Sequence, residues 1–335
     1  MTEIAAIARD PLWFPHRFDP GQATVHFRRF DRDTHREATF ITDEYLPAGD
    51  PTVIRLADAM AARPAAAPLH FVFHSAFCCS TVLARAFDLP GAAMGLKEPV
   101  FLNDLVGWQH RGGSARDIAP VLDAGLTLLA RPFGRGEAVV IKPSNVCNGL
   151  APAMLTMRSA ARALLLYAPL PVFLGSIAKK EMTGRLWARD LLVKQLRERL
   201  HPFGYTTDDY LGQTDLQAAA MTWLAQQALF AHLVATFGPR VRSLDSDRLM
   251  AEPVAAMRAL AALYGIALDA EAVVAGPAFT THSKSGDRFG SEARAAENAA
   301  AATAHRDEID KVVVWTEAVA KATGVPMTPG NPLLG

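Results

Sequence analysis

One stretch of the sequence, residues 69–87, constrains the fold more than any other. It consists of a short apolar run, a turn of small and hydroxyl residues from His74 to Ser80, and an amphipathic run. This order predicts a β-strand, a tight turn and a helix. Such a turn directs several backbone N–H groups and the positive end of a helix at one point, as in anion-binding sites. At the carboxyl end of a strand in an α/β protein, phosphate-bearing ligands bind at this position.

After residue 68, short apolar runs alternate with longer helical patterns. The strand candidates are residues 69–73, 138–141, 163–167 and 241–244, and the helix candidates are residues 118–130, 181–200, 215–237, 253–264 and 291–323. Buried strands that alternate with helices predict a parallel sheet covered on both faces. We therefore expect an α/β domain, a three-layer sandwich with a parallel central sheet, over residues 66–335.

Residues 1–65 predict an irregular or partly β lead-in segment that packs on this main domain. Residues 23–27 and 39–42 are strand candidates, and residues 53–62 are a helix candidate. The segment 63–68 contains two prolines and interrupts the pattern before the first strand of the main domain.

Composition excludes several classes of protein. The 335 residues include 34 Lys and Arg and 34 Asp and Glu, so the net charge is zero. A chain without net positive charge gives no indication of a nucleic acid partner. The longest apolar stretch, residues 163–178, is interrupted by Pro169 and Pro171 and is too short to span a membrane. The amino terminus lacks the pattern of a secretory signal, and the three cysteines have no metal-ligand spacing. We expect a cytoplasmic protein without a metal or membrane partner.

The turn departs from the P-loop pattern G-x-x-x-x-G-K-[ST]. When Thr81 is aligned with the final position, Ser80 takes the place of the lysine, and Cys79 and His74 take the places of the glycines. Nucleoside triphosphatases need that lysine as a charge on the β- and γ-phosphates. The sequence therefore disfavours an ATPase or a kinase.

The turn instead resembles the 5′-phosphosulfate-binding loop of the sulfotransferase family, where Gly/Cys-Ser/Thr-Thr precedes a helix. The segment LKEP, residues 96–99, resembles the carboxylate-proline element of several bacterial sulfotransferases. Residues 164–176 resemble the strand-turn-helix that supplies 3′-phosphate contacts, and residues 241–266 resemble the late strand, acidic turn and proline-led helix. In order and spacing, residues 69–266 resemble a divergent bacterial member of the P-loop sulfotransferase-like family.

The resemblance implies transfer of a sulfuryl group from 3′-phosphoadenylyl sulfate (PAPS), a co-substrate, to a hydroxyl or amine of a small-molecule acceptor. For such a transfer Glu98 is the candidate general base, because a carboxylate near the carboxyl edge of the sheet can take the acceptor proton, and Pro99 keeps it out of the α region. Lys142 follows the predicted strand 138–141 at the same edge and is the candidate cation that offsets charge on the reacting oxygens. The implied contacts to the 5′-phosphosulfate come from Ser75, Phe77, Cys78, Cys79, Ser80, Thr81 and Val82. The implied contacts to the 3′-phosphate come from Ser176, Lys180 and Lys284.

Two positions depart from the family pattern. Phe77 stands where the family loop carries a lysine or arginine, and Tyr167 stands where an arginine precedes the 3′-phosphate element. Any charge for the donor phosphates must then come from elsewhere, and the candidates are Lys97, Lys142, Lys179, Lys180 and Lys284.

Alternatives to this interpretation remain open. The missing cations and the glycine-free loop favour a degenerate, non-catalytic P-loop nucleotide-binding module. The spacing of Cys79 and Arg85 fits the C-x5-R pattern of cysteine-dependent phosphatases, although residues 82–85 are helical in pattern. Each site residue also has an ordinary structural role available, such as a helix cap for Ser176 or a satisfied buried imidazole for His74. The sequence predicts neither the acceptor nor the oligomeric state.

Overall fold

The central element of the fold is a five-stranded, fully parallel sheet with the strand order β5-β6-β4-β7-β8. The computed structural model describes residues 3–281 and 305–335. The strands are β4 (Leu69–His74), β5 (Ala93–Lys97), β6 (Ala138–Lys142), β7 (Ala163–Tyr167) and β8 (Val241–Asp245). Every residue of β4, β5, β6 and β7 is buried, as expected for strands covered on both faces.

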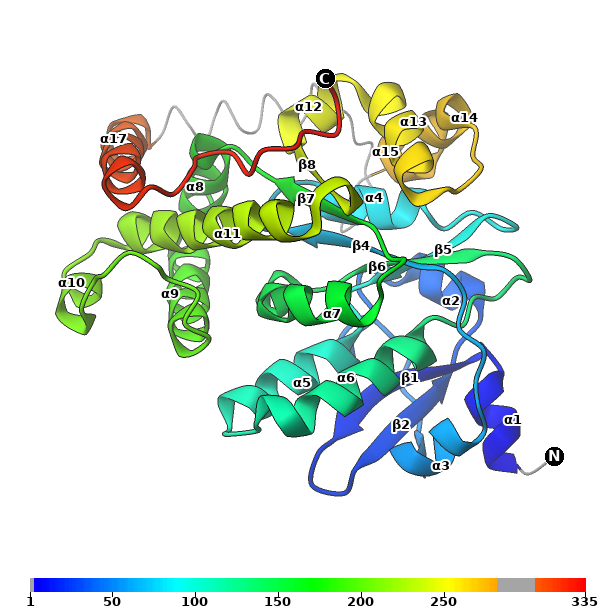
Figure 1. Cartoon of the computed structure of the whole chain (residues 1–335). Coiled ribbons are helices and arrows are strands. Elements are labelled where there is room, and N and C mark those ends of the chain that lie inside the picture. The colour runs from blue at the N-terminus through cyan, green and yellow to red at the C-terminus, as the bar shows by residue number, and fades with distance from the viewer. Residues whose placement is uncertain (1–2, 282–304) are drawn as a thin grey trace.

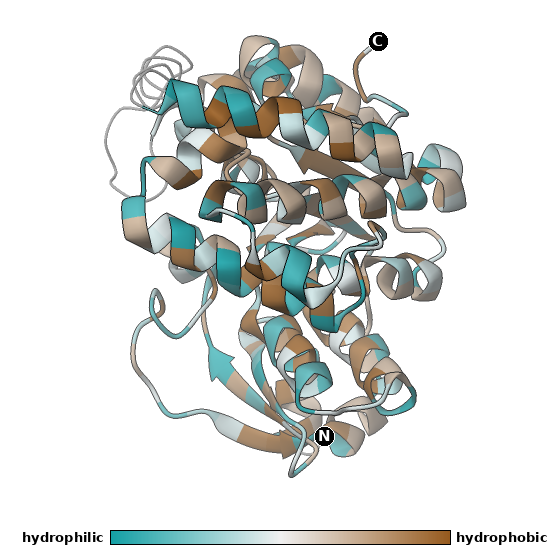
Figure 2. Ribbon diagram, turned by 90° about the vertical axis from the view of Figure 1, so that its left-hand side faces the viewer, coloured by the Kyte–Doolittle hydropathy of each residue, from teal (hydrophilic) through white to brown (hydrophobic). Residues whose placement is uncertain are grey.

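Helices cover both faces of the sheet, which confirms the predicted three-layer α/β sandwich (Figure 1). One face packs against α4 (Ser80–Ala86), α8 (Leu170–Ala178), α12 (Ser246–Ala251) and α13 (Pro253–Tyr264). The other face packs against α5 (Val100–His110), α6 (Ala115–Leu129) and α7 (Ala151–Met157). Figure 2 shows the apolar strands inside and hydrophilic residues along the outer helices.

The main domain contains several further helices. They are η1 (Asn145–Leu150), α9 (Glu181–Arg197), α10 (Thr207–Leu211), α11 (Asp215–Phe237), η2 (Gly238–Arg240), α14 (Ala270–Ala275), α15 (Pro277–Thr280) and α17 (Arg306–Thr323). A capping box of Thr214 and Gln217 starts α11, whose residues are mostly buried. Across residues 3–281 and 305–335, no helix combines the length and the apolar character that crossing a bilayer requires.

The amino-terminal residues form a second, smaller sheet. It is antiparallel, with β1 (Trp13–Asp19), β2 (Thr24–Arg29) and β3 (Thr52–Arg55), and it is accompanied by α1 (Glu3–Arg9), α2 (Arg32–Glu37) and α3 (Leu56–Ala61). The predicted strand at residues 39–42 is wrong, because this segment is bent and belongs to neither sheet. The predicted helix 53–62 is partly wrong, because its first residues belong to β3. The domain boundary near residue 65 stays a prediction.

The sequence patterns located most of the main domain. The four predicted strands are present, and α11 and α13 have the predicted bounds. The patterns missed β5 and α5. The predicted helix 291–323 is described from α17 onward, and its earlier part lies outside the described residues. Residues 330–334 run along the outer side of β8, where the Ser243 N–H donates to the Asn331 carbonyl (3.0 Å).

Candidate functional site

The topology directs a ligand to the carboxyl end of β4. The chain leaves β4 through α4 toward β5 on one side, whereas it leaves β7 toward β8 on the other side. In open parallel sheets, the crevice where the connections diverge in this way is the usual ligand site. The loop of residues 75–79 lies at this switch point, between β4 and α4.

This loop is strained in a way that suits an anion. Ala76, Phe77 and Cys79 have positive φ angles of 72°, 53° and 60°. Each non-glycine residue in the left-handed region costs about 1–2 kcal/mol, and such strain concentrates at functional sites. Left-handed residues in a turn direct successive N–H groups to one side and form an anion-binding nest. The glycine-free loop therefore adopts the backbone conformation that glycine usually provides.

Two of the predicted ligand contacts, Ser75 and Val82, already form hydrogen bonds within the protein. The Ser75 side chain is fully buried, and its Oγ donates to the Ala76 carbonyl (3.1 Å) and accepts the Ala168 N–H (3.0 Å). The Val82 N–H donates to the Cys79 carbonyl (3.0 Å) within the first turn of α4. Ser75 therefore positions the loop, and the Val82 N–H is not available to a phosphate. Cys78 is buried in the core.

Two buried amides hold the loop from below. Asn148, in η1, donates through Nδ2 to the His74 carbonyl and to Gln226 Oε1, both at 3.0 Å. Gln226, in α11, donates through Nε2 to the Ser75 carbonyl (3.4 Å). Neither residue was predicted, because no local sequence pattern marks an amide that bonds to a loop more than seventy residues away.

His74 has the role of a buried imidazole whose two ring nitrogens are hydrogen-bonded. Its Nδ1 accepts the Ala76 N–H (3.1 Å), so its Nε2 is the donor to the Pro143 carbonyl (3.1 Å). Burial, reinforced by the charge of Lys142, holds the pKa of His74 well below the ordinary value. The neutral imidazole thus links the loop to the end of β6.

Glu98 and Lys142 meet at the same edge of the sheet. Their side chains form an ion pair through Glu98 Oε1, and the Glu98 N–H donates to the Lys142 carbonyl (2.8 Å). The Lys142 side chain is 1% exposed and that of Glu98 is 19% exposed. His74 Nε2 lies 3.9 Å from the same Oε1, so the pair adjoins the loop. Glu98 Oε2 has no hydrogen-bond partner among the described residues.

The backbone aims Glu98 from a turn. Its φ angle is 54°, in the left-handed region and outside the right-handed α region that the following Pro99 disfavours. The helix α5 begins directly after this proline. The strand end, the left-handed residue and the following helix together fix where the carboxylate lies.

The Lys180 side chain lies beside Phe77, which occupies the position where a basic residue was expected. Lys180 Nζ lies 5.9 Å from the centre of the Phe77 ring. The ring is held at 5.1 Å from Trp187 and 5.8 Å from Phe173, centre to centre. Lys180 is exposed, so its ammonium remains open to a ligand beside the loop. Lys180 therefore lies beside Phe77 of the loop, and the pair of Glu98 and Lys142 lies beside His74, the residue that precedes the loop.

Other predicted cations and contacts lie elsewhere. The Lys97 ammonium is buried, donates to the Arg36 carbonyl (3.0 Å) and also contacts the Ala38 carbonyl. Burial lowers the pKa of Lys97 to about 8. Ser176 Oγ donates to the Val172 carbonyl of its own helix (2.8 Å). Lys284 lies outside the described residues.

Tyr167 supplies a phenol where the family pattern has an arginine. Its side chain is buried at the end of β7, beside the loop strand. Burial, with the charge of Asp245, raises the pKa of Tyr167 to about 12. The phenol is therefore neutral at physiological pH, and this strand adds no positive charge to the switch point.

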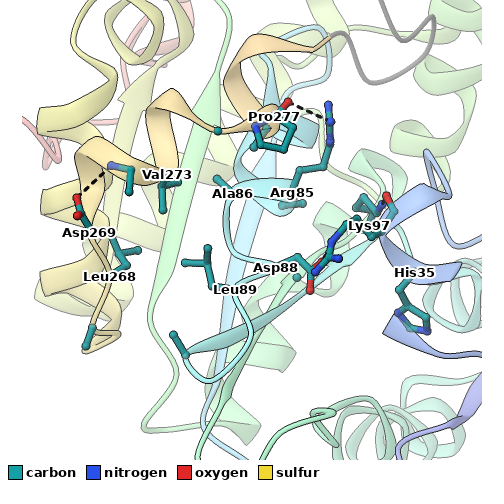
Figure 3. Close-up of a pocket in the computed structure, with 18 residues that line it drawn as sticks. His35, Arg85, Ala86, Asp88, Leu89, Lys97, Leu268, Asp269, Val273 and Pro277 are labelled. Carbon is teal, nitrogen blue, oxygen red and sulfur yellow. Dashed lines mark hydrogen bonds and ion pairs between the residues drawn. The ribbon is translucent and has the colours of Figure 1, made fainter. Parts of the chain in front are cut away.

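An apolar cavity of about 390 Å³ lies at the other end of α4 (Figure 3). Its charged residues are already bound to the protein. Arg85 donates to the carbonyls of Thr281 (2.8 Å) and Pro277 (3.1 Å), and Asp88 pairs with Arg32 (2.8 Å). The cavity lies at the carboxyl end of α4, whereas the loop lies at its amino end. Because the charged side chains of the cavity already have partners within the protein, we place the candidate site at the loop.

The described residues contain no group of three or more His, Cys, Asp or Glu side chains placed to hold a metal ion. The three cysteines, Cys78, Cys79 and Cys147, are free thiols.

Comparison with known proteins gives similarity in structure only. No family model matches the chain, and no curated protein matches its sequence. The sulfotransferase domain from the curacin biosynthetic pathway matches with 11% identity and a TM-score of 0.39, over 67% of this chain and 80% of that one. The sulfotransferase domain of the Synechococcus PCC 7002 olefin synthase matches with 14% identity and a TM-score of 0.41, over 67% and 82%. Sulfotransferase STF1 from Mycobacterium tuberculosis H37Rv matches with 12% identity and a TM-score of 0.38, over 70% and 77%.

Proposed function

We propose that this protein transfers a sulfuryl group from PAPS to a hydroxyl or amine of a small-molecule acceptor. The observation that carries the proposal is the juxtaposition of a strained anion nest with an ion-paired carboxylate. The nest is formed by residues 76–79, and the neutral His74 ring connects it to Glu98, 3.9 Å away. Both lie at the switch point of the sheet, where α/β proteins bind nucleotides.

The residues at the nest fit a phosphosulfate. The Ala76 N–H is bound to His74, so the backbone N–H groups that follow it in the loop, with the hydroxyls of Ser80 and Thr81, would hold its oxygens. Lys180, beside Phe77, would add the positive charge that the loop itself lacks. PAPS supplies a sulfuryl group attached through a bridging oxygen to a phosphate, which departs with that oxygen.

Glu98 would act as the general base. Its Oε1 is held by Lys142, whereas its Oε2 has no partner among the described residues and would accept the proton of the acceptor. As the acceptor O–H or N–H bond breaks, the new bond to sulfur forms and the bond from sulfur to the bridging oxygen breaks. The proton ends on Glu98 and the electron pair ends on the departing phosphate.

Lys142 would change its partner during this step. In the structure, its buried ammonium is neutralised by the Glu98 carboxylate. Once Glu98 takes the proton, the charge of Lys142 becomes available to the sulfuryl and bridging oxygens, where negative charge develops. The same residue thus fixes the base before the reaction and stabilises the leaving group during it.

The test is sulfate transfer from PAPS to a panel of small hydroxyl and amine acceptors, with Glu98→Gln as the key variant. Glutamine keeps an oxygen for Lys142 but accepts no proton as a base. We expect transfer to fall by about a hundredfold or more, as for loss of a general base, while the nucleotide still binds. The exposed Glu252, which pairs with Arg248 on α12, provides the matched control Glu252→Gln. Undiminished transfer by Glu98→Gln would contradict the assignment of the base.

A non-catalytic nucleotide-binding module is the second candidate, and the uncharged Phe77 and Tyr167 favour it. Nucleotide binding without transfer to any acceptor would support it. A cysteine-dependent phosphatase is disfavoured, because Arg85 is bound to the carbonyls of Thr281 and Pro277 at the far end of α4. The proposal also places the protein in a reducing cytoplasm, in keeping with its free thiols.

A further inference from the structure

The apolar cavity at the carboxyl end of α4 is separate from the candidate site. Its lining comes from α2, α4, β5, α14, α15 and the turns next to them, and it includes neither Glu98 nor Lys142 nor any residue of the 75–79 loop. Figure 3 shows the cavity between the α14 segment and the residues that follow α4. Its volume of about 390 Å³ lies within the usual range of small-molecule sites, about 300–1,000 Å³.

The walls of the cavity are aliphatic. Leu89, Leu268, Val273 and Pro277 contribute apolar side chains, and alanines make up much of the remaining lining. Among the described residues, no Phe, Tyr or Trp lines the cavity. The ring of His35, which also belongs to the lining, packs edge-on against phenylalanines outside it. A ligand therefore meets aliphatic surface without an aromatic partner for stacking, which favours a saturated chain.

Two cations of the lining are bound to main-chain carbonyls only. Arg85 donates to two carbonyls at the ends of α15 (2.8 and 3.1 Å). Lys97 Nζ donates to the Arg36 carbonyl (3.0 Å) and contacts the Ala38 carbonyl. An ammonium has three N–H donors, so one donor of Lys97 has no partner within residues 3–281 and 305–335. No Asp or Glu in the same part of the chain forms an ion pair with either cation.

The two positive charges lie near each other, and the carboxylates of the lining have other partners. Burial, followed by the charge of Arg85, lowers the pKa of Lys97 to about 8, so Lys97 is largely protonated at neutral pH. Asp88 pairs with two arginines of α2 (2.8 and 3.0 Å). Asp269 caps α14 and accepts a main-chain N–H (3.0 Å). Because a buried charge is costly without a counter-charge, an anion that enters this cavity is favoured.

We propose that this cavity binds a straight-chain aliphatic carboxylate, with its chain against the aliphatic walls and its head group at Arg85 and Lys97. The guanidinium and the ammonium would donate charge-assisted hydrogen bonds to the carboxylate oxygens. The walls formed by Leu89, Leu268 and Val273 would remove the chain from water. This binding is independent of the proposed sulfuryl transfer, because the reacting groups lie at the loop and not in the cavity.

The first test is a calorimetric titration of the full chain with octanoate, 1-octanol and octyltrimethylammonium, which share one alkyl chain and differ in the head group. We expect octanoate to bind at least about fivefold more tightly than either of the other two. Arg85→Gln keeps a donor for an α15 carbonyl but carries no charge. It should weaken octanoate binding by about fivefold and leave 1-octanol binding unchanged.

The second test fills the cavity. Ala272 is an exposed residue of α14 that lines the cavity, so Ala272→Phe should reduce the binding of octanoate and of 1-octanol by about tenfold or more. The matched control is Ala275→Phe, because Ala275 is an exposed alanine of the same helix outside the lining. This control variant should bind both ligands as the original protein does.

Equal binding of the three ligands would overturn the inference, and so would octanoate binding that is unchanged in Ala272→Phe. A preference for octanoate over 1-octanol that remains in Arg85→Gln would overturn the assignment of the head group. Arg85 holds α15, so Arg85→Gln has a structural risk. The comparison of Ala272→Phe with Ala275→Phe keeps the test decisive, because both residues are exposed and neither substitution removes a side-chain hydrogen bond.

Discussion

Glu98 and Lys142 form an ion pair across the ends of two neighbouring strands, and a backbone hydrogen bond from the Glu98 N–H to the Lys142 carbonyl (2.8 Å) joins the same residues. The lysine is almost completely buried, whereas the carboxylate keeps one edge toward solvent. This arrangement makes the carboxylate both the partner of a buried cation and a group that is partly exposed to solvent. Mutation can separate the contribution of the ion pair to stability from the proposed role of the carboxylate as a base.

Removal of the carboxylate should destabilise the fold. Glu98→Leu leaves the Lys142 ammonium buried without a partner, and we expect the free energy of unfolding to fall by about 3 kcal/mol. The double variant Glu98→Leu/Lys142→Met removes both charges and should recover most of this loss. Urea denaturation of the three proteins measures both effects. A double variant as unstable as Glu98→Leu would show that the buried charge is not the cause.

The left-handed loop should tolerate glycine and reject β-branched residues. Cys79 has a φ of 60°, so Cys79→Gly relieves the conformational cost and should leave stability unchanged or raise it by about 1 kcal/mol. Cys79→Val should lower stability by about 1–2 kcal/mol, because β-branched residues are rarely found in this region. Urea denaturation compares the two variants. Equal stability of the valine and glycine variants would contradict the strained conformation of the loop.

Acid should destabilise the protein through its buried histidines. Burial lowers the pKa of His35 to about 3, and that of His70 and His201 to about 4, against an ordinary value of 6.5. Below pH 6.5 the unfolded chain therefore binds more protons than the folded one. Stability is complete above this pH and declines as the pH falls toward 4, by about 1.4 kcal/mol per pH unit for each such histidine.

His35 provides the clearest test of this dependence. Within the part of the chain that the structure describes, neither of its ring nitrogens has a hydrogen-bond partner, and the ring packs edge-on against Phe14 and Phe133. His35→Phe should reduce the slope of stability against pH between 6 and 4 by about one proton, or 1.4 kcal/mol per unit. Replacement of the exposed His232 by Phe is the control. An unchanged slope in His35→Phe would rule out His35 as a source of the acid sensitivity.

Much of the sheet was predictable from sequence, because its strands are short, continuous apolar runs bounded by breakers. The strand β5 was missed because Gly95 interrupts its apolar pattern, although this glycine is required: a Cβ there would lie 1.9 Å from the Ala84 carbonyl oxygen. The segment 39–42 has strand-like residues, but the Ile41 N–H bonds to the carbonyl of Lys97 in isolation rather than in a ladder. Local pattern does not encode such a tertiary partner.

The candidate site was likewise predictable only in part. The loop, Glu98 and Lys142 were predicted at one edge of the sheet, because carboxyl ends of parallel strands lie together. Their ion pair depends on the register of β5 against β6, which pairs Lys97 with Lys142. The support from Asn148 and Gln226 depends on η1 and α11 packing below the loop. Register and packing of remote elements are properties of the folded chain.

Lys180 should supply the charge that Phe77 does not. If its ammonium reaches a phosphate beside the loop, Lys180→Ala should weaken binding of 3′-phosphoadenosine 5′-phosphate by about tenfold, equivalent to about 1.4 kcal/mol. Lys180→Arg should bind nearly as well as the original protein, and the neighbouring Lys179→Ala is the matched control. The difference should shrink at high salt, because the lysine is exposed. Equal losses in the Lys179 and Lys180 variants would indicate only a general charge effect.

The most direct test of the account is a calorimetric titration of the protein with 3′-phosphoadenosine 5′-phosphate, with ADP as the comparison. If the strained loop and its neighbours form a site for a 3′-phosphoadenylyl donor, this nucleotide should bind at least about tenfold more tightly than ADP. Ser80→Ala/Thr81→Ala should abolish the binding. No binding, or binding that favours ADP, would contradict the proposed donor and with it the assignment of sulfuryl transfer.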